Sequence, residues 1–410
     1  MLMKFLIKIY SNTFLLFSLS LLFYVTYQSE ITYDGVRRDY YWKYQIISFF
    51  LILFSILTFY LNKKIKEYLI IISISFIFAL YLFESYLSFK FRPNINESLF
   101  EKKIGKKIDK RTRLQIYEDL RKIDKNVSIH IGPAGYINDN YKIFPLSSLS
   151  NSKTIFCNEN GYYSIFKHDR YGFNNPDEIW DNEKINYMLI GDSFVHGACV
   201  NRPNDIASLL RNYSGKSVLN LGYGGNGPLI NYAILREYLT PNVKNILWFY
   251  YEGNDLKNLD SELSNKILKT YLNNLNFTQN LKYRQKEIDN LTKKMIQSQL
   301  NILKNKYYKF NKLKYEIKNF IKIYHTRSQF TPSPKPKAEF IKVINLVNKT
   351  AKENGSKLYF VYLPEYKRYI KNYNNESYLL IKNIISDLNI PFIDIHEEIF
   401  EKEENPLNLS

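Results

Sequence analysis

Three long apolar stretches dominate the beginning of the chain. No charged residue occurs from Ile9 to Tyr27 or from Tyr44 to Asn62, and a third stretch, Tyr68 to Phe89, contains only Glu84. A helix needs about 20 apolar residues to cross the roughly 30 Å of hydrocarbon in a bilayer. The pattern therefore predicts three transmembrane helices within a membrane anchor over residues 1–92, with Glu84 near enough to the end of its span to reach the interface.

The charges that flank these stretches predict an orientation. Lys4 and Lys8 precede the first stretch, and Lys63, Lys64 and Lys66 lie between the second and the third. Since short cytoplasmic loops are enriched in Lys and Arg, the amino terminus is expected in the cytoplasm and the body of the chain on the far side. No small-residue cleavage pattern follows the first stretch, which favours an uncleaved anchor. We expect a protein of the cytoplasmic (inner) membrane, in contact with membrane lipid, with a periplasmic or otherwise extracytoplasmic body.

Residues 93–184 contain a polar, lysine-rich segment followed by a segment of short apolar runs. A lysine-rich stretch from Lys102 to Lys110 leads into a helical pattern from Arg111 to Ile123 and resembles a stalk. From Val127 to Asp181, short apolar runs alternate with Gly and Pro, which is typical of strands and tight turns. This part is interpreted as a stalk and a strand-rich extension of the domain that follows.

From Ile185 onward, strand and helix patterns alternate. Five apolar runs are expected as strands buried on both faces: Tyr187 to Ile190, Val218 to Leu221, Ile246 to Tyr251, Leu358 to Leu363 and Pro391 to Ile395. Helical patterns separate them, at Asp205 to Tyr213, Leu229 to Leu239, Ala338 to Asn354 and Glu376 to Leu388. This order predicts an α/β domain over residues 185–410, with a three-layer, flavodoxin-like parallel sheet.

A long interval, residues 256–336, interrupts the alternation. It is rich in Lys and Asn, has helical periodicity and ends in a Pro-rich segment, TPSPKPK. We expect a helical insertion that covers one side of the sheet, because an amphipathic stripe is usually a packing face.

Composition narrows the functional classes only a little. The net charge of +18 is spread through the chain without a compact basic stripe, so no nucleic-acid partner is expected, while attraction to anionic lipid or acidic glycan remains open. The two cysteines, Cys157 and Cys199, form no CxxC pair, and no residue spacing indicates a metal or cofactor. Two buried thiols are the simplest interpretation, but an even pair outside the cytoplasm also predicts a Cys157–Cys199 disulfide.

The chemically informative segments follow the first three predicted strands of the α/β domain. LIGDSFVHG ends the first strand and contains Ser193, NLGYGGNGP follows the second and contains Gly225, and EGNDL follows the third and contains Asn254. Ligands of open α/β sheets bind outside the carboxyl ends of the strands, where a serine lies beside backbone N–H groups. Each segment alone also suits a turn or a helix cap. Their ordered occurrence predicts one shared crevice.

In these blocks the chain resembles the GDSL/SGNH esterase and lipase superfamily, over Ile185 to about Ile395. The resemblance implies that Ser193 is the nucleophile. It also implies that the N–H groups of Ser193 and Gly225 and the side-chain amide of Asn254 form the oxyanion hole. Donors fixed where an acyl carbonyl develops negative charge each contribute on the order of 3 kcal/mol to transition-state stabilisation.

The fourth block of the family, DxxH, has no match in this sequence. Asp394 and His396 in FIDIHEE are one residue too close together, so they are weak candidates for the acid and base. A strand-end aspartate that caps the next helix and a solvated histidine form the favoured alternative. The family pattern then places the histidine beyond Ser410.

The resemblance implies a membrane-anchored esterase or O-acyltransferase that acts on an O-acylated envelope glycan or lipid through an acyl-enzyme on Ser193. The alternative is an SGNH-like glycan-binding or scaffold module without catalysis.

Overall fold

A computed structural model describes residues 2–90, 101, 105, 107–305, 308–330, 334–370 and 373–409. Most of the predicted stalk between residues 93 and 106, and the start of the Pro-rich segment at 331–333, lie outside the described residues. The chain forms two compact units, Met1–Asn94 with Lys309–Pro332 and Ile95–Tyr308 with Ser333–Ser410. They are described in turn.

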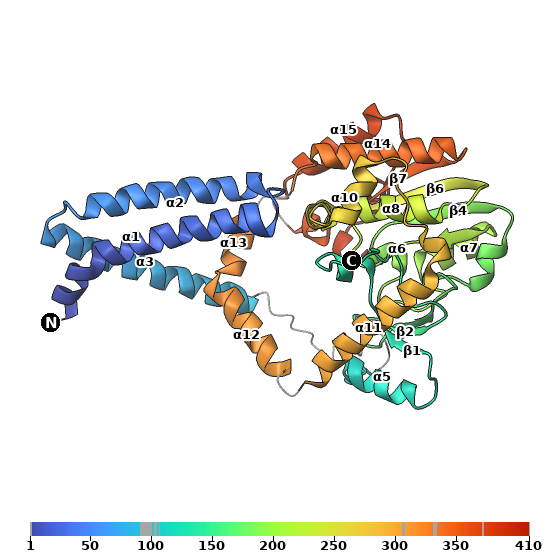
Figure 1. Cartoon of the computed structure of the whole chain (residues 1–410), viewed down its shortest axis with the longest axis horizontal. Coiled ribbons are helices and arrows are strands. Elements are labelled where there is room, and N and C mark those ends of the chain that lie inside the picture. Colours follow the sequence, from blue (N-terminus) through green and yellow to red (C-terminus); the bar gives the residue numbers. More distant parts are fainter. Residues whose placement is uncertain are drawn as a thin grey trace. The chain divides into compact units, whose positions relative to one another are not determined.

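The first unit contains three helices that are long and apolar enough to cross a membrane: α1 (Leu2–Tyr27), α2 (Arg38–Thr58) and α3 (Lys63–Lys90) (Figure 1). A π-helical turn, η1 (Gln28–Thr32), continues α1. Most of the large apolar side chains of these helices are exposed, whereas Ser18, Ser48 and Ser55 are buried and bond to carbonyl groups of their own helices. Small residues at helix contacts and apolar residues outside are typical of membrane helices. The three predicted spans are thus compatible with a membrane anchor.

Two helices from the middle of the sequence belong to the same unit. They are α12 (Tyr308–Ile321), apart from its first residue, and α13 (Tyr324–Phe330), which packs against α3. The sequence predicts that the whole interval 256–336 covers the sheet, but its described residues 309–330 pack with the membrane helices instead. The reason is visible at Glu84, which is fully buried and accepts hydrogen bonds from the backbone of His325 and Thr326. A buried carboxylate needs donors, and the N–H groups at the start of α13 supply them.

The second unit is built on a five-stranded parallel sheet, in the order β5-β4-β6-β7-β8. The strands are β4 (Ile185–Ile190), β5 (Val218–Asn220), β6 (Val243–Tyr251), β7 (Lys357–Leu363) and β8 (Phe392–Asp394). All five predicted strands are present, and the α/β class with a parallel sheet is confirmed.

Helices pack on both faces of this sheet. On one face, Leu189, Phe249 and Val361 form a core with Ala207 of α7. The alternate strand residues point the other way, where the Tyr250 ring packs 5.7 Å from that of Phe340 on α14. Side chains of a strand alternate between the two faces, so runs that are apolar at every position are buried on both.

The helices of the second unit are mostly short. The α-helices are α5 (Arg113–Arg121), α6 (Ser193–His196), α7 (Ile206–Ser214), α8 (Pro228–Tyr238), α9 (Asp255–Glu262), α10 (Lys266–Asn273), α11 (Gln285–Lys304), α14 (Ala338–Glu353), α15 (Glu376–Asp387) and α16 (Ile395–Glu398). The 3-10 helices are η2 (Pro133–Tyr136), η3 (Asp177–Asp181), η4 (Leu281–Tyr283), η5 (Tyr366–Tyr369), η6 (Phe400–Lys402) and η7 (Pro406–Leu409). Of the predicted insertion, α10 packs on α8 and α11 packs on α5.

The extension before the main sheet forms a three-stranded sheet of its own. Strand β2 (Lys153–Ile155) pairs in parallel with β1 (Val127–Ile129) and antiparallel with β3 (Ile165–Lys167). Helix α5 covers it and begins with a capping box between Thr112 and Gln115.

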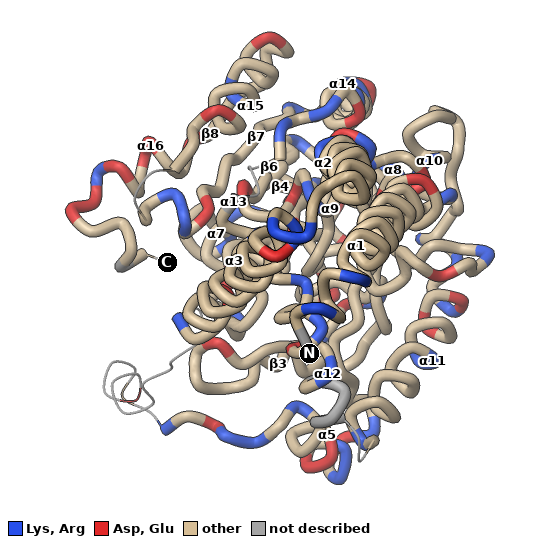
Figure 2. The backbone as a smooth tube through the Cα atoms, turned by 90° about the vertical axis from the view of Figure 1, so that its left-hand side faces the viewer, with Lys and Arg blue, Asp and Glu red and all other residues tan. Residues whose placement is uncertain are grey.

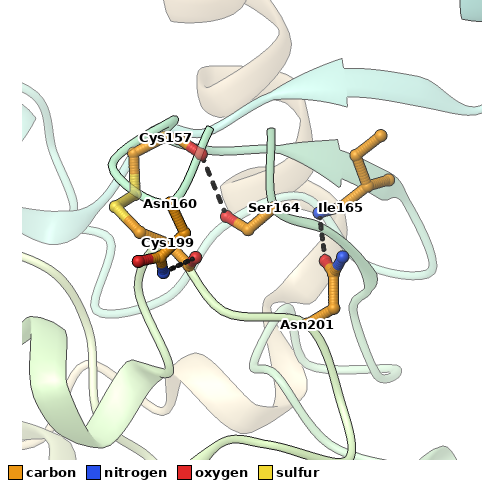
Figure 3. The surroundings of a disulfide bond; sticks show 6 residues. All are labelled: Cys157, Asn160, Ser164, Ile165, Cys199 and Asn201. Carbon is orange, nitrogen blue, oxygen red and sulfur yellow. Dashed lines mark hydrogen bonds between the residues drawn. A yellow bond between two sulfur atoms is a disulfide. The ribbon is translucent and has the colours of Figure 1, made fainter. Parts of the chain in front are cut away.

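A disulfide ties this extension to the loop that follows the Ser193 turn. Cys157 and Cys199 are bonded, with a Cα–Cα distance of 4.9 Å (Figure 3). Two further contacts support the link, since Asn160 donates to the Cys199 carbonyl and the Ile165 N–H donates to Asn201. The extension is therefore fixed beside the segment that carries the predicted nucleophile.

Charged residues are interspersed along the chain. Lys and Arg and, less often, Asp and Glu are scattered along much of the tube in Figure 2, whereas the long membrane-compatible helices are largely free of both. This distribution matches the spread expected from the sequence.

Candidate active site

Ser193 lies at the carboxyl end of β4, the central strand of the three that carry the motif blocks. Asp192 caps α6 by accepting the Phe194 N–H at 3.0 Å, which makes Ser193 the first helical residue. The turn is tight, because a Cβ at Gly191 would lie 2.6 Å from Val195 Cγ2. Ser193 is partly exposed, and its Oγ donates to Asp192 Oδ2 at 3.4 Å.

The loop with Gly225 follows β5 and packs against the same turn. The Tyr223 N–H donates to the Gly191 carbonyl at 3.1 Å. Gly225 has φ +84°, in the left-handed region that favours glycine, and its carbonyl accepts a hydrogen bond from Asn258 Nδ2 at 3.2 Å. This loop is therefore held between the Ser193 turn and α9.

Asn254 follows β6 and precedes α9, but its side chain does not cap that helix. Ser193 Oγ donates a hydrogen bond to Asp192, and the Asn254 side chain lies near enough to the same carboxylate to lower its pKa. Burial raises the pKa of Asp192, while the Phe194 backbone N–H and the nearby Ser193 and Asn254 side chains act in the opposite direction. Burial and the nearby Asp192 also raise the pKa of Asp255.

These contacts bring two of the predicted site residues to one carboxylate and place the third on an adjoining loop. Since β5, β4 and β6 are neighbours and parallel, Ser193, Gly225 and Asn254 all follow the carboxyl ends of adjacent strands. Gly225 and Asn254 are also partly exposed. The roles of nucleophile and oxyanion donors stay predictions.

A buried cluster of aromatic rings and histidines includes His196, the last residue of the helix that begins at Ser193. The fully buried His196 ring stacks on Tyr223 at 4.4 Å and lies 5.0 Å from the His130 ring. His168 completes the cluster and bonds to Ser152, Thr154 and Tyr223. Burial lowers the pKa of all three histidines, that of His168 to about 4, so they are neutral at pH 7.

The sequence did not predict this histidine cluster, because its members come from separate segments of the chain and share no spacing. Within the described residues, no group of three or more His, Cys, Asp or Glu side chains is arranged to hold a metal ion.

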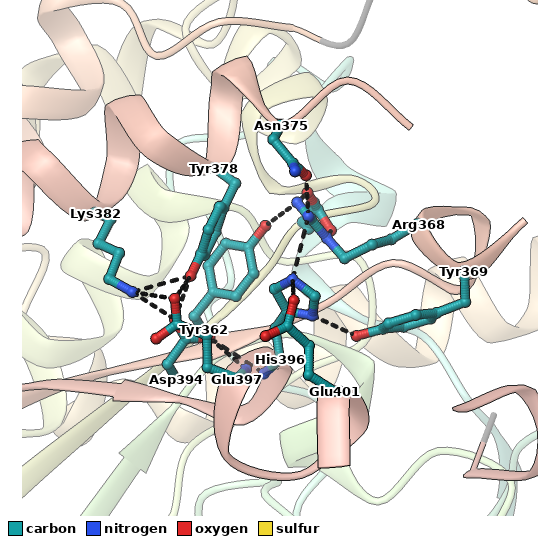
Figure 4. Close-up of polar contacts among 11 residues, drawn as sticks. Tyr362, Arg368, Tyr369, Asn375, Tyr378, Lys382, Asp394, His396, Glu397 and Glu401 are labelled. Atoms are coloured by element: carbon teal, nitrogen blue, oxygen red, sulfur yellow. Dashed lines mark hydrogen bonds and ion pairs between the residues drawn. The ribbon is translucent and has the colours of Figure 1, made fainter. Parts of the chain in front are cut away.

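Asp394 and His396 do not form an acid–base pair (Figure 4). The Asp394 carboxylate caps α16 by accepting the backbone N–H groups of His396 and Glu397, and it also accepts from Tyr378 and Lys382. The His396 ring contacts the Tyr369 hydroxyl at 2.9 Å and Glu401 at 3.3 Å. Capping by Asp394 agrees with the alternative drawn from the sequence. His396 is buried, with only 7% of the residue exposed, whereas that alternative expected it to be solvated.

An ion pair between Arg368 and Glu252 lies beside His396 and fixes the carboxyl ends of β6 and β7. Both side chains are almost fully buried, and Arg368 also lies 3.5 Å from the His396 Nε2. Burial and the Arg368 charge lower the pKa of His396. Among the described histidines, no ring nitrogen hydrogen-bonds to Ser193, whose Oγ bonds to Asp192. The pair escaped prediction because Glu252 and Arg368 are far apart in the sequence.

A cavity of about 210 Å³ lies elsewhere, near the start of β4, and is lined by Ile185, Thr240 and Asn242 among others. These residues stand at the amino ends of β4 and β6, away from the motif blocks, and Ser193 does not line the cavity.

Comparison with known proteins adds no identification, since no family model and no curated protein matches the chain.

Proposed function

We propose that the protein is a membrane-anchored serine esterase or O-acyltransferase of the SGNH type. The observation that carries the proposal is the convergence of Ser193 and Asn254 on the Asp192 carboxylate, with the Gly225 loop held against the same turn. A nucleophile and oxyanion donors must meet at one substrate carbonyl, and these contacts support such a meeting.

In the proposed reaction, Ser193 Oγ attacks the ester carbonyl and forms a tetrahedral intermediate. Its oxyanion accepts hydrogen bonds from the N–H groups of Ser193 and Gly225 and from the Asn254 amide. Collapse expels the alcohol and leaves an acyl group on Ser193, which water or a sugar hydroxyl then removes. The serine proton passes to a general base and from there to the leaving alcohol; in the family that the chain resembles, this base is the histidine of a DxxH block, which the sequence does not contain.

The proposed substrate is an O-acyl ester of an envelope glycan or lipid. The support is the anchor, since three apolar helices precede the domain and the flanking lysines favour an inner-membrane protein with a periplasmic body. An enzyme held at that surface meets envelope polymers and lipids.

A second candidate, an SGNH-like glycan-binding or scaffold module without catalysis, has one observation in its favour. His396 is held by Tyr369, Glu401 and Arg368, and Ser193 is not among its partners.

Hydrolysis of p-nitrophenyl acetate by the full chain in detergent separates the two candidates. The esterase should lose turnover to background in Ser193→Ala and about 10²- to 10³-fold in Asn254→Ala, as expected for one oxyanion donor. Ser214→Ala, at the end of α7, is the matched control and should keep the wild-type rate. Wild-type turnover equal to that of Ser193→Ala would favour the silent module.

A further inference from the structure

Helix α12 carries an exposed apolar stripe beside a row of lysines. Leu313, Ile317 and Ile321 recur every four residues, and their side chains are 51%, 50% and 62% exposed. Each is followed directly by a lysine, so that Lys314, Lys318 and Lys322 form a parallel exposed row. An apolar stripe flanked by basic residues is typical of helices that lie in a membrane interface.

The carboxyl end of α12 is attached to the membrane helices of its own unit (Figure 1). Tyr81 of α3 donates to the Ile321 carbonyl at 2.9 Å, and the Tyr81 ring packs 5.4 Å from Phe320. Lys322 donates to the Tyr24 hydroxyl of α1 at 3.1 Å.

Helix α13 makes contacts of the same kind. Arg327 donates to the Tyr40 hydroxyl of α2, and Glu84 of α3 accepts from the first turn of α13. Tyr24 stands near the end of α1 and Tyr40 near the start of α2, so both mark one edge of the membrane-compatible bundle. Tyrosines at that depth are typical of the lipid headgroup level.

We propose that α12 lies in the headgroup layer at this edge and binds anionic phospholipid. The apolar stripe then enters the upper acyl region, and the lysine row faces the phosphate groups, with the lysine stems covering part of the apolar surface. Lipid is favoured over a protein partner because the stripe continues directly from contacts with the membrane helices, and because the lysine row complements acidic headgroups. The inference depends on the spans crossing a membrane and is independent of any reaction at Ser193.

The test uses the full chain in nanodiscs that contain phosphatidylcholine with or without phosphatidylglycerol. Because both native cysteines are in the disulfide, a single added cysteine can carry an environment-sensitive fluorophore. Ile317→Cys places the label on the apolar stripe. Tyr315→Cys, about 160° away around the helix at 100° per residue, is the matched control on the other face. Quenching by lipids with bromine near the top of the acyl chain reports the depth of each label.

The label at residue 317 is expected to be quenched by the brominated lipid, more strongly when phosphatidylglycerol is present, and the label at 315 much less. Replacing all three lysines of the row by Gln should lower the ratio of docked to undocked α12 by about 100-fold, at roughly fivefold per lysine. Equal quenching at 317 and 315 would overturn the proposal. Quenching at 317 that is unaffected by phosphatidylglycerol and by the lysine changes would also overturn it. A residue-317 label that is shielded only at high protein density in the disc would overturn it too, because a second copy of the chain would then cover the stripe.

Discussion

Glu262 holds the candidate oxyanion loop in place and gives the sharpest test of how the site is built. It ends α9, the helix that Asn254 precedes, and its side chain is fully buried. Its Oε1 accepts the Gly227 N–H at 2.6 Å and its Oε2 accepts the Leu229 N–H at 2.9 Å. These N–H groups belong to the start of α8, so a single carboxylate caps α8 and ties the Gly225 loop to α9.

Replacing Glu262 by Ala leaves both N–H groups buried without an acceptor. At about 1–3 kcal/mol for each, the free energy of unfolding should fall by about 2–6 kcal/mol. Glu262→Gln should also destabilise, because its NH₂ group meets one of the two N–H donors. Either change loosens the Gly225 loop, so ester hydrolysis should fall even in protein that remains folded.

The pH dependence provides a second signature of Glu262. Burial raises its pKa to about 7 from 4.5, while hydrogen bonds from the Gly227 and Leu229 backbone oppose the shift. Because the pKa of Glu262 is higher in the folded state, its contribution to the free energy of unfolding is fully present below pH 4.5. That contribution, up to about 3 kcal/mol, is lost as the pH rises through 7. Glu262→Gln does not titrate in this range, so its free energy of unfolding should fall further below that of wild type at pH 5 than at pH 8.

The assay is denaturant unfolding of the full chain in detergent, followed by tryptophan fluorescence in a Trp42→Phe background, so that Trp180 and Trp248 report on the second unit alone. Glu287→Gln, which removes an exposed ion pair with Arg284, is the matched control and should change stability by less than about 1 kcal/mol. If Glu262→Ala unfolds at the same denaturant concentration as the control, the structural role assigned to this carboxylate is wrong.

Three further predictions follow from individual contacts. Replacing both Cys157 and Cys199 by Ser, which opens a link across 42 residues, should lower the free energy of unfolding by about 4 kcal/mol in the loop-entropy model; a loss below about 1 kcal/mol would contradict that role. Burial lowers the pKa of His168 from 6.5 to about 4, so its contribution to stability is present above pH 6.5 and lost as the pH falls towards 4. Burial raises the pKa of the neighbouring Asp169 to about 6, so Asp169 has the opposite effect on stability as the pH falls. His168→Gln should therefore reduce the loss of stability between pH 6.5 and 4, and unfolding curves that shift with pH as in wild type would refute this. Glu84→Ala should free α13 and speed tryptic cleavage at Arg327, whereas Glu67→Ala, on the same helix, should not; equal rates in the two variants would show that Glu84 does not hold α13.

The sequence predicted the main sheet well because its strands are buried on both faces. Such strands are continuous apolar runs, and in β6 and β7 the runs from Ile246 and Leu358 lie within the observed strands. The motif blocks also lie at one edge of the sheet, as expected, since the carboxyl ends of parallel strands lie together. These features are local in sequence and can be read from it.

Features that depend on distant partners could not be predicted. The periodicity of α12 shows that it has an apolar face but does not say which surface that face meets, so the sequence placed α12 over the sheet instead of with the membrane helices. The hydrogen bonds of Glu84 could not be predicted, because its partners in α13 lie more than 200 residues away in the sequence. The ion pair of Glu252 and Arg368, and the cap that Glu262 provides for α8, have the same origin in long-range packing.

A fluorophosphonate probe shows directly whether Ser193 becomes covalently acylated. The full chain is treated with the probe in membranes, digested, and examined by peptide mass spectrometry. The proposal predicts one modified peptide containing Ser193, modification that is lost in Ser193→Ala, and slower modification in Asn254→Ala because an oxyanion donor is missing. Folded wild-type protein that stays unmodified at Ser193 would contradict the esterase and favour the silent module.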